Sequence, residues 1–454
     1  MVQQSHKRDE IRKQLQPFFE DLIETVIQAR SSEEPRITEL KIARAGDRLG
    51  AEAIGRWLLG YDLDASLINV DGACHYRMSK PVEKTYHTQR GEVRLARHVY
   101  RPSGEHNGAI VCPLEARVGM VHGEWTPGCA EAMAYIAQEL PERAASKVAQ
   151  KLGAMAYSFN SFKRVARTLG ARWEADRDQH EEATIQAFKI PDAAARLAVS
   201  IDRVSLLIDE EQKLNWRMAY CGTLTLYDGT GEPLKTLRYG RMPGEGAHIL
   251  REQMKWDVAA IGGRREDLEV VTLSDGAAEL CNILDADYPE AARYIDYYHV
   301  VEKLSAALTA FCNKRSTSKK AKELLAKWKT ELLNTPNAIE NIERTIKRWR
   351  AVNLEVGGQK PVHQALTYIA NHKAQMNYAE ARAKGHPIGS GHVEACCKQL
   401  VQTRMKRNGQ RWKPRGGQSI LTLRSLATDA RWEDAMQVMM PSFMRCVEPA
   451  AQAA

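Results

Sequence analysis

The spacing of apolar residues changes several times along the chain, and these changes divide it into parts. From residue 7 to 30, apolar residues recur every three or four positions, which predicts an amphipathic helix, and a second helix is expected over 39–59. Between 74 and 114 the pattern alternates with a period of two, which predicts short strands and a hairpin. We therefore expect an N-terminal helical region (1–70) followed by a small β-rich segment (71–125).

Helical spacing returns after residue 126 and predicts two consecutive helices, over 141–153 and 158–169. Ala149 and Gly153 have the small-residue spacing that lets two helices pack at the angle of a helix-turn-helix motif. The second helix carries Lys163, Arg164 and Arg167 opposite its apolar residues. The region 126–190 is therefore either a DNA-reading unit or a plain helical hairpin, and the basic side favours DNA.

The segment 191–300 has the most regular alternation of strands and helices. Strands are expected over 197–208, 216–227, 234–239, 268–273 and 293–299, with a helix over 246–260 and a short helix after the fourth strand. This order predicts an α/β catalytic domain with a ribonuclease-H-like sheet. The next stretch, 301–384, is helical and basic without strand signals, which predicts a helical insertion.

The final part, 385–454, begins with a turn-rich segment, and Ser390 is expected to cap the helix that follows. Glu394 then falls in the first turn, where the helix dipole favours a carboxylate. A basic strip follows without any acidic residue before Asp429; it comprises Lys398, Arg404, Lys406, Arg407, Arg411, Lys413 and Arg415. A last helix is expected over 424–440.

Three acidic residues occupy positions that suit metal-dependent phosphodiester chemistry. Asp202 lies within the first strand of the catalytic domain, Asp275 ends the fourth, and Glu394 begins the helix after the insertion. Each alone would be ordinary, but together they form a candidate site for Mg²⁺ or Mn²⁺. Two such ions, about 4 Å apart, activate the attacking oxygen and stabilise the leaving one.

The charge distribution favours a nucleic-acid partner. The formal net charge is +8, and the basic strip concentrates positive charge directly behind Glu394. We expect Arg404, Lys406, Arg407 and Arg411 to contact the DNA backbone. The alternative is a solvated basic helix face. Trp412 either stacks beside these cations or packs in the core, and the sequence leaves both open.

The cysteines and histidines give no clear metal pattern. The nine cysteines include no C-x-x-C pair, so neither a disulfide framework nor a zinc site is indicated. The β-rich segment is rich in candidate ligands, but their spacing favours ordinary polar positions: His75, His87, His98, His106, Cys112, His122 and Cys129. The polar N-terminus and the lack of a long apolar run predict a soluble, cytoplasmic protein with no membrane association.

Four motifs together resemble a DDE transposase of bacterial insertion sequences, and most of all its ISKra-type branch. They lie at 200–205, 273–276, 296–304 and 389–394, the last continuing through Arg404 to Trp412. The resemblance implies that Asp202, Asp275 and Glu394 hold the catalytic metal ions. Asp296 and His299 match a [Cys/Asp]-x-x-His element, which implies that His299 contacts a DNA phosphate; it could equally pin its strand to the insertion. Many relatives carry paired cysteines in the N-terminal hairpin, whereas this chain has only Cys112 there.

The resemblance implies a transposase that binds terminal inverted repeats and uses Mg²⁺ for DNA cleavage and strand transfer. Because two element ends must meet, it also implies a homo-oligomer on DNA. Two alternatives remain at this point. One is a domesticated, non-catalytic DNA-binding regulator derived from a transposase. The other is a ribonuclease-H-like nuclease that cleaves without joining.

Overall fold

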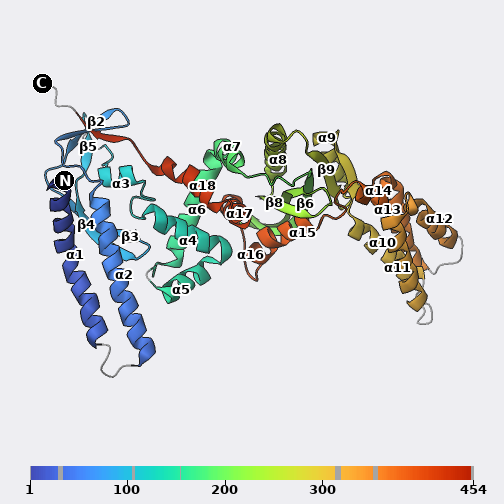
Figure 1. Ribbon diagram of the computed structural model, residues 1–454, viewed down its shortest axis with the longest axis horizontal. Helices are drawn as coiled ribbons and strands as arrows, with labels where there is room; N and C mark the ends of the chain where they lie inside the picture. The colour runs from blue at the N-terminus through green and yellow to red at the C-terminus, as the bar shows by residue number, and fades with distance from the viewer. Residues whose placement is uncertain are drawn as a thin grey trace. The chain divides into compact units, whose positions relative to one another are not determined.

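The computed structural model describes residues 2–28, 34–104, 108–153, 155–311, 318–350 and 356–450. The chain forms two compact units, one of Met1–His180 with Trp432–Ala454 and the other of Glu181–Arg431 (Figure 1). The boundary lies ten residues before the expected position near Pro191, within α7 (Arg177–Ala187).

The C-terminal segment belongs to the first unit and not, as expected, to the catalytic part. The reason is strand pairing, because β11 (Val447–Pro449) pairs antiparallel with β1 (Leu67–Val70). The single helix expected over 424–440 is two helices, α17 (Pro414–Thr428) and α18 (Trp432–Met439). Between them Ala430 adopts a left-handed conformation with φ of 56°, which ends the first helix.

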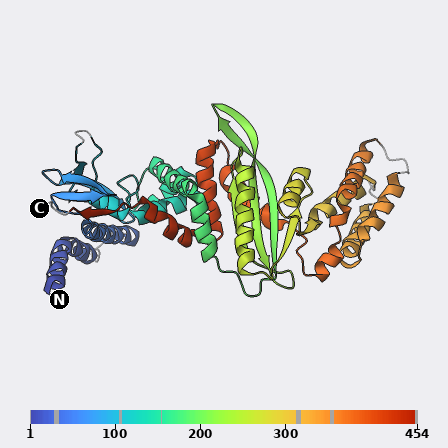
Figure 2. The ribbon, with the colours of Figure 1, turned by 90° about the horizontal axis from the view of Figure 1, so that it is seen from above.

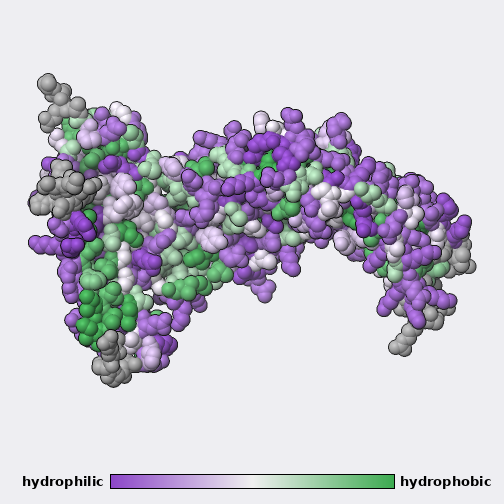
Figure 3. Space-filling model, viewed as in Figure 1, coloured by the Kyte–Doolittle hydropathy of each residue, from purple (hydrophilic) through white to green (hydrophobic). Residues whose placement is uncertain are grey.

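The first unit begins with the two predicted helices, α1 (Val2–Gln28) and α2 (Pro35–Leu59), which pack against each other as a hairpin. Apolar side chains remain exposed on this hairpin, among them Phe19 and Ile27. Figure 3 shows a hydrophobic area over α1 and α2. A four-stranded sheet has the order β11-β1-β2-β5, and β3 and β4 form a separate hairpin. The bounds of these strands are β2 (Ala73–Arg77), β3 (Val82–Thr88), β4 (Gly91–Arg97) and β5 (Tyr100–Pro102).

Four helices complete the N-terminal part of this unit: α3 (Pro113–Val118), α4 (Pro127–Glu139), α5 (Glu142–Leu152) and α6 (Phe159–Ala175). The expected helix pair is α5 and α6. Ser158 caps α6, since its Oγ accepts a hydrogen bond from the Ser161 amide at 3.2 Å. The apolar side of α6, including Phe162, Val165 and Leu169, is fully buried.

The second unit is a mixed α/β unit built on a five-stranded sheet with the order β10-β9-β6-β7-β8. The predicted succession of three strands, a helix, a strand, a helix and a strand is confirmed. The strands are β6 (Arg196–Glu210), β7 (Lys213–Tyr227), β8 (Pro233–Arg241), β9 (Glu269–Ser274) and β10 (Ala292–Ile295). β6, β7 and β8 are antiparallel neighbours, whereas β9 pairs parallel to β6 and β10 parallel to β9.

Helices cover both faces of this sheet (Figures 1 and 2). On one face α8 (Gly246–Arg264) and α9 (Ala278–Asp287) pack against the apolar side of β6 and β7. α8 approaches so closely that a Cβ added at Gly222 would lie 2.3 Å from Met254 Sδ. The other face is covered by α15 (Gly391–Cys396), a turn of π-helix, η2 (Cys397–Gln402), and α17. The short α16 (Thr403–Met405) follows η2.

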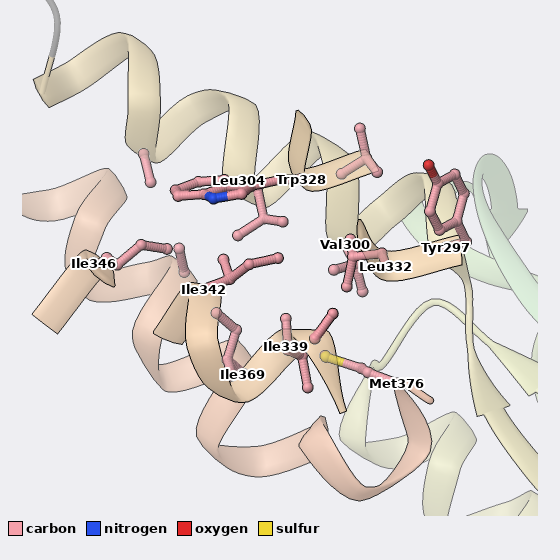
Figure 4. Close-up of a cluster of buried hydrophobic side chains, with 14 of the residues drawn as sticks. Tyr297, Val300, Leu304, Trp328, Leu332, Ile339, Ile342, Ile346, Ile369 and Met376 are labelled. Carbon is pink, nitrogen blue, oxygen red and sulfur yellow. The ribbon is translucent and has the colours of Figure 1, made fainter. Parts of the chain in front are cut away.

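A helical insertion lies between β10 and α15, as predicted, and its described residues contain no strand. Its helices are α10 (Tyr297–Phe311), α11 (Ser318–Asn334), α12 (Ala338–Arg350), α13 (Val356–His372) and α14 (Tyr378–Ala383). Their inward side chains form one apolar core, with Leu304, Trp328, Ile342 and Ile369 at its centre (Figure 4). β10 ends at Ile295, so His299 lies in the first turn of α10 and not in a strand.

This core predicts a local stability effect. Leu304→Ala removes a side chain that is 1% exposed, and we expect it to cost about 3 kcal/mol because the cavity cannot fully collapse. Amide hydrogen exchange in α10 and α13 should then accelerate by about two orders of magnitude. The matched change Glu302→Ala, on the exposed side of the same helix, should leave exchange unchanged. Equal exchange in both variants would contradict the packing described here.

Candidate active site

Asp202 lies on β6 two residues beyond Ser200, the last residue that pairs with β9. Its side chain is therefore beside the end of β9 without being covered by that strand. Asp202 Oδ1 accepts from the Arg203 amide at 2.6 Å, and Oδ2 accepts from the Cys397 thiol at 3.5 Å. Burial raises the pKa of Asp202, and the negative charge of Asp275 raises it further.

Asp275 follows β9 directly, in a loop that is fixed on both sides. Its Oδ1 accepts from the Ala277 amide at 2.8 Å, and its backbone carbonyl accepts from the Tyr368 hydroxyl on α13 at 2.7 Å. Gly276 has φ of 86°, a conformation that favours glycine. The insertion therefore holds the loop that carries Asp275.

Glu394 lies in the first turn of α15, with its side chain half exposed. Its Oε1 lies 3.7 Å from His299 Nδ1 and 3.5 Å from Ser390 Oγ. The expected side-chain cap by Ser390 is wrong, because Ser390 Oγ donates to Asp296 Oδ2 at 2.9 Å instead. The Ser390 backbone carbonyl accepts from the Val393 and Glu394 amides at 3.0 and 3.3 Å.

His299 lies among four carboxylates. Its Nδ1 is 3.2 Å from Asp296 Oδ1, and this hydrogen bond is the main reason why the pKa of His299 is raised. Burial opposes the shift, while the charges of Asp296, Glu394 and Asp275 reinforce it. Asp202 also interacts with the charge of His299, which lowers the pKa of that carboxyl. All three sequence-predicted acids therefore interact with the charge of His299, but Glu394 alone among them belongs to a close group of ligand atoms with it.

One group of three metal-ligand side chains has all its ligand atoms within 4.8 Å of one another in the described part of the chain: Asp296, His299 and Glu394. It shares only Glu394 with the predicted set. Asp296 is fully buried, and although burial by itself would raise its pKa, hydrogen bonds from His299 and Ser390 lower it. Asp296 is therefore a carboxylate held in its charged form by the protein's own donors.

The basic strip is divided by burial. Arg404 is 0% exposed and lies 5.2 Å from the Trp412 ring, so our expectation that it contacts DNA is wrong for this structure. Trp412 is also buried, and its Nε1 donates to the Met405 carbonyl at 3.0 Å; it therefore packs in the core and also lies beside one cation of the strip, the buried Arg404. The other cations of the strip are exposed: Lys398, Lys406, Arg407, Arg411, Lys413 and Arg415.

The candidate residues of the first unit lie on α6 as expected. Arg164 and Arg167 are exposed and Lys163 is half buried. Arg164 forms an ion pair with Glu124, so part of its charge is already neutralised. α5 and α6 contact each other directly, and the cations lie on the side of α6 away from its core.

Several of the histidines and cysteines considered as zinc ligands have other partners. His98 Nδ1 is 2.8 Å from Asp62 Oδ2, and the His87 ring stacks on Trp125 at 4.2 Å. Cys112 packs in an apolar cluster. His106 lies outside the described residues.

Sequence reasoning missed two residues of the site. Cys397, which donates to Asp202, lies three residues after Glu394, and this spacing places both side chains on one side of the helix. That signal was available in the sequence. Tyr368, which holds the Asp275 loop, comes from the middle of the insertion, and no local pattern distinguishes it from an ordinary helix residue.

No protein-family model matches this chain, and no curated protein is significantly similar to it. Among the described residues, no helix combines the length and apolar character needed to cross a membrane.

The environment of His299 predicts its titration. We expect its imidazole to titrate above the ordinary pKa of 6.5 and to move toward that value in Asp296→Asn, which removes the main cause of the shift. Because the folded-state pKa is raised, the stabilisation from protonated His299 is fully present below about pH 6.5 and is lost as the pH rises through the raised value.

NMR titration of the histidine side chains measures this, and His392 is an internal control. Burial and the nearby Arg238 lower the pKa of His392, so it should titrate below 6.5 in both proteins. A His299 that titrates below 6.5, or a shift of the same size in His392, would contradict the assigned cause.

Proposed function

We propose that this chain is a DDE-type transposase that binds the terminal inverted repeats of an insertion sequence and catalyses DNA cleavage and strand transfer. The sheet order supports a ribonuclease-H-like catalytic domain. Numbered within the unit, the strands run 3-2-1-4-5, with three antiparallel neighbours and two parallel additions. The end of the fourth strand is paired with the first up to Leu273 and Ser200, and Asp275 and Asp202 each lie two residues beyond that pair.

The observation that carries the proposal is that Asp202, Asp275 and Glu394 all interact electrostatically with His299, with Glu394 Oε1 3.7 Å from His299 Nδ1. Carboxylate oxygens are the ligands that Mg²⁺ prefers, and Mn²⁺ accepts the same set. The mutual repulsion of Asp202 and Asp275 is the kind of interaction that a bound cation relieves. The donor set therefore fits divalent hard cations, which when bound would activate water or a 3′-hydroxyl and stabilise the leaving oxygen.

The chain's own residues have distinct roles in this proposal. Asp202, Asp275 and Glu394 hold the cations, and protonated His299 offers a positive charge to a phosphate oxygen. Exposed Lys406, Arg407 and Arg411 bind the DNA backbone through charge. The α5–α6 pair recognises the terminal repeat, and two copies of the chain bring two ends together.

The reaction has two displacements at phosphorus. In the first, water attacks the phosphodiester at an end of the element and releases a 3′-hydroxyl. In the second, this hydroxyl attacks a phosphodiester of the target DNA, so one bond forms for each bond that breaks. Both need in-line geometry and a stabilised phosphoryl charge, which one site can provide.

The first functional prediction concerns the acids. Asp202→Asn, Asp275→Asn and Glu394→Gln should each lower cleavage of a DNA carrying the terminal repeats by about a thousandfold or more, because a metal-held phosphoryl charge is worth several kcal/mol. The losses should not add in double variants. DNA binding should persist. The control is Glu279→Gln, a nearby acid that pairs with Arg203 and Tyr220.

The same assay separates the alternatives. Cleavage without joining by the wild-type chain would indicate a nuclease, and binding without cleavage would indicate a regulator. Near wild-type cleavage by any one acid variant would remove that residue from the site.

The second functional prediction concerns recognition. Lys163→Ala, Arg164→Ala and Arg167→Ala together should weaken binding to the terminal repeat and reduce the salt dependence, by about one unit of slope per lost phosphate contact. The matched variant removes the same charge from α5 through Arg143→Ala, Lys147→Ala and Lys151→Ala, and should lose less specificity. If both triple variants lose affinity equally on any DNA sequence, α6 does not recognise the terminal repeat and belongs to a nonspecific basic surface.

A further inference from the structure

Asp296 is a buried carboxylate, and both of its oxygens already accept hydrogen bonds from the protein. Its side chain is fully buried, and four donors reach it. Oδ1 accepts from the His299 amide at 2.8 Å and from His299 Nδ1 at 3.2 Å. Oδ2 accepts from the Ser390 amide and from Ser390 Oγ. A carboxylate has about four lone-pair sites, so these bonds leave none for an ion.

The four bonds join two distant segments of the chain. His299 begins α10, and Ser390 lies 94 residues after Asp296, in the turn before α15. Two further contacts dock this turn. The Tyr297 amide donates to the Ile388 carbonyl at 2.9 Å, and a Cβ at Gly389 would lie 3.0 Å from the Tyr298 ring. The turn is therefore held against the start of α10 by side-chain and backbone bonds together.

The position of Glu394 depends on this turn. Its amide donates to the Ser390 carbonyl, so a displacement of Ser390 is transmitted to the first turn of α15. His299 is oriented by the same carboxylate. One buried side chain thus determines where two groups of the site lie, although it touches neither DNA nor Glu394 itself.

We infer that Asp296 is a positioning residue that fixes Glu394 through Ser390 and fixes His299 directly, and that it is not a metal ligand. The effect of Asp296 on catalysis rests on the proposed function, whereas its effect on the positions of Ser390 and His299 depends only on the fold. It accounts for the proximity of Asp296, His299 and Glu394 without an ion among them.

The experiment compares Ser390→Ala, Ser390→Thr, Asp296→Asn and the double variant Asp296→Asn/Ser390→Ala in the full chain. Ser390→Ala deletes the hydroxyl that donates to Asp296 and that also lies 3.5 Å from Glu394 Oε1, whereas Ser390→Thr keeps this hydroxyl. With DNA carrying the terminal repeats and Mn²⁺, we expect Ser390→Ala to lower the cleavage rate about tenfold, and Ser390→Thr to retain it within about threefold.

Asp296→Asn places an amide donor against the Ser390 donors and should cost about a hundredfold. The double variant should be no slower than Asp296→Asn, because both changes break the same contact. If Asp296 were a metal ligand, the two losses would multiply and Ser390→Thr would rescue nothing. That result would overturn the inference.

A second readout does not need catalysis. Amide exchange of the segment 391–396, without metal or DNA, should be faster in Ser390→Ala than in Ser390→Thr or wild type. If the wild-type chain cleaves no DNA, the proposed function fails while this exchange pattern still supports positioning. Equal exchange in all three proteins would overturn the positioning role whether or not DNA is cut. If Asp296→Asn does not fold, the two Ser390 variants still decide the question.

Discussion

The electrostatic interaction of His299 with the carboxylates near it is the interaction on which the rest of this site depends. Asp202, Asp275, Asp296 and Glu394 all act on the charge of His299. The charge of Asp275 raises the pKa of Asp202, and a positive charge nearby opposes that shift. Asp296 is compensated by protein donors alone, and Asp202 by one amide and one thiol against burial and a neighbouring charge. The site therefore contains one acid that is fully satisfied and others that a cation would stabilise.

The sheet and the insertion together determine where these four acids lie. The parallel pairing of β9 with β6 stops at Ser200 and Leu273. Asp202 and Asp275 lie just beyond this last pair, so the β6–β9 ladder does not include them. The insertion begins one residue after β10 and returns just before Ser390, which is why Asp296 can bond to both ends of it. Its apolar core gives a rigid support for Tyr368, which holds the Asp275 loop. The insertion therefore supports the segments that carry Asp275 and Glu394, although it separates them in the sequence.

Much of this arrangement is predictable from the sequence, because strands and helices with strong periodicity dominate the second unit. The order of elements and the helical insertion follow from local patterns, as does the break after α16, where Gly409 has φ of 75°. The predictions that are wrong concern features that depend on contacts between segments distant in the sequence. The sequence predicts His299 in a strand, because no local pattern shows that Asp296 accepts from its amide at the start of a helix.

The sequence also does not predict which of the cations in the basic strip is buried. Arg404 belongs to a run of cations that are otherwise exposed, and only its packing under Trp412 distinguishes it. The return of the C-terminus to the first unit depends on pairing between β11 and β1, which are separated by most of the chain. Contacts of such long range leave no periodic signal, so the boundary of the unit had to come from the structure.

The most direct test of the central claim is anomalous diffraction from crystals of the full chain soaked in Mn²⁺. The account predicts ions held by Asp202, Asp275 and Glu394, with Asp296 still bonded to Ser390 and His299. An ion bound instead by Asp296, His299 and Glu394, or no ion at any of these carboxylates, would contradict it.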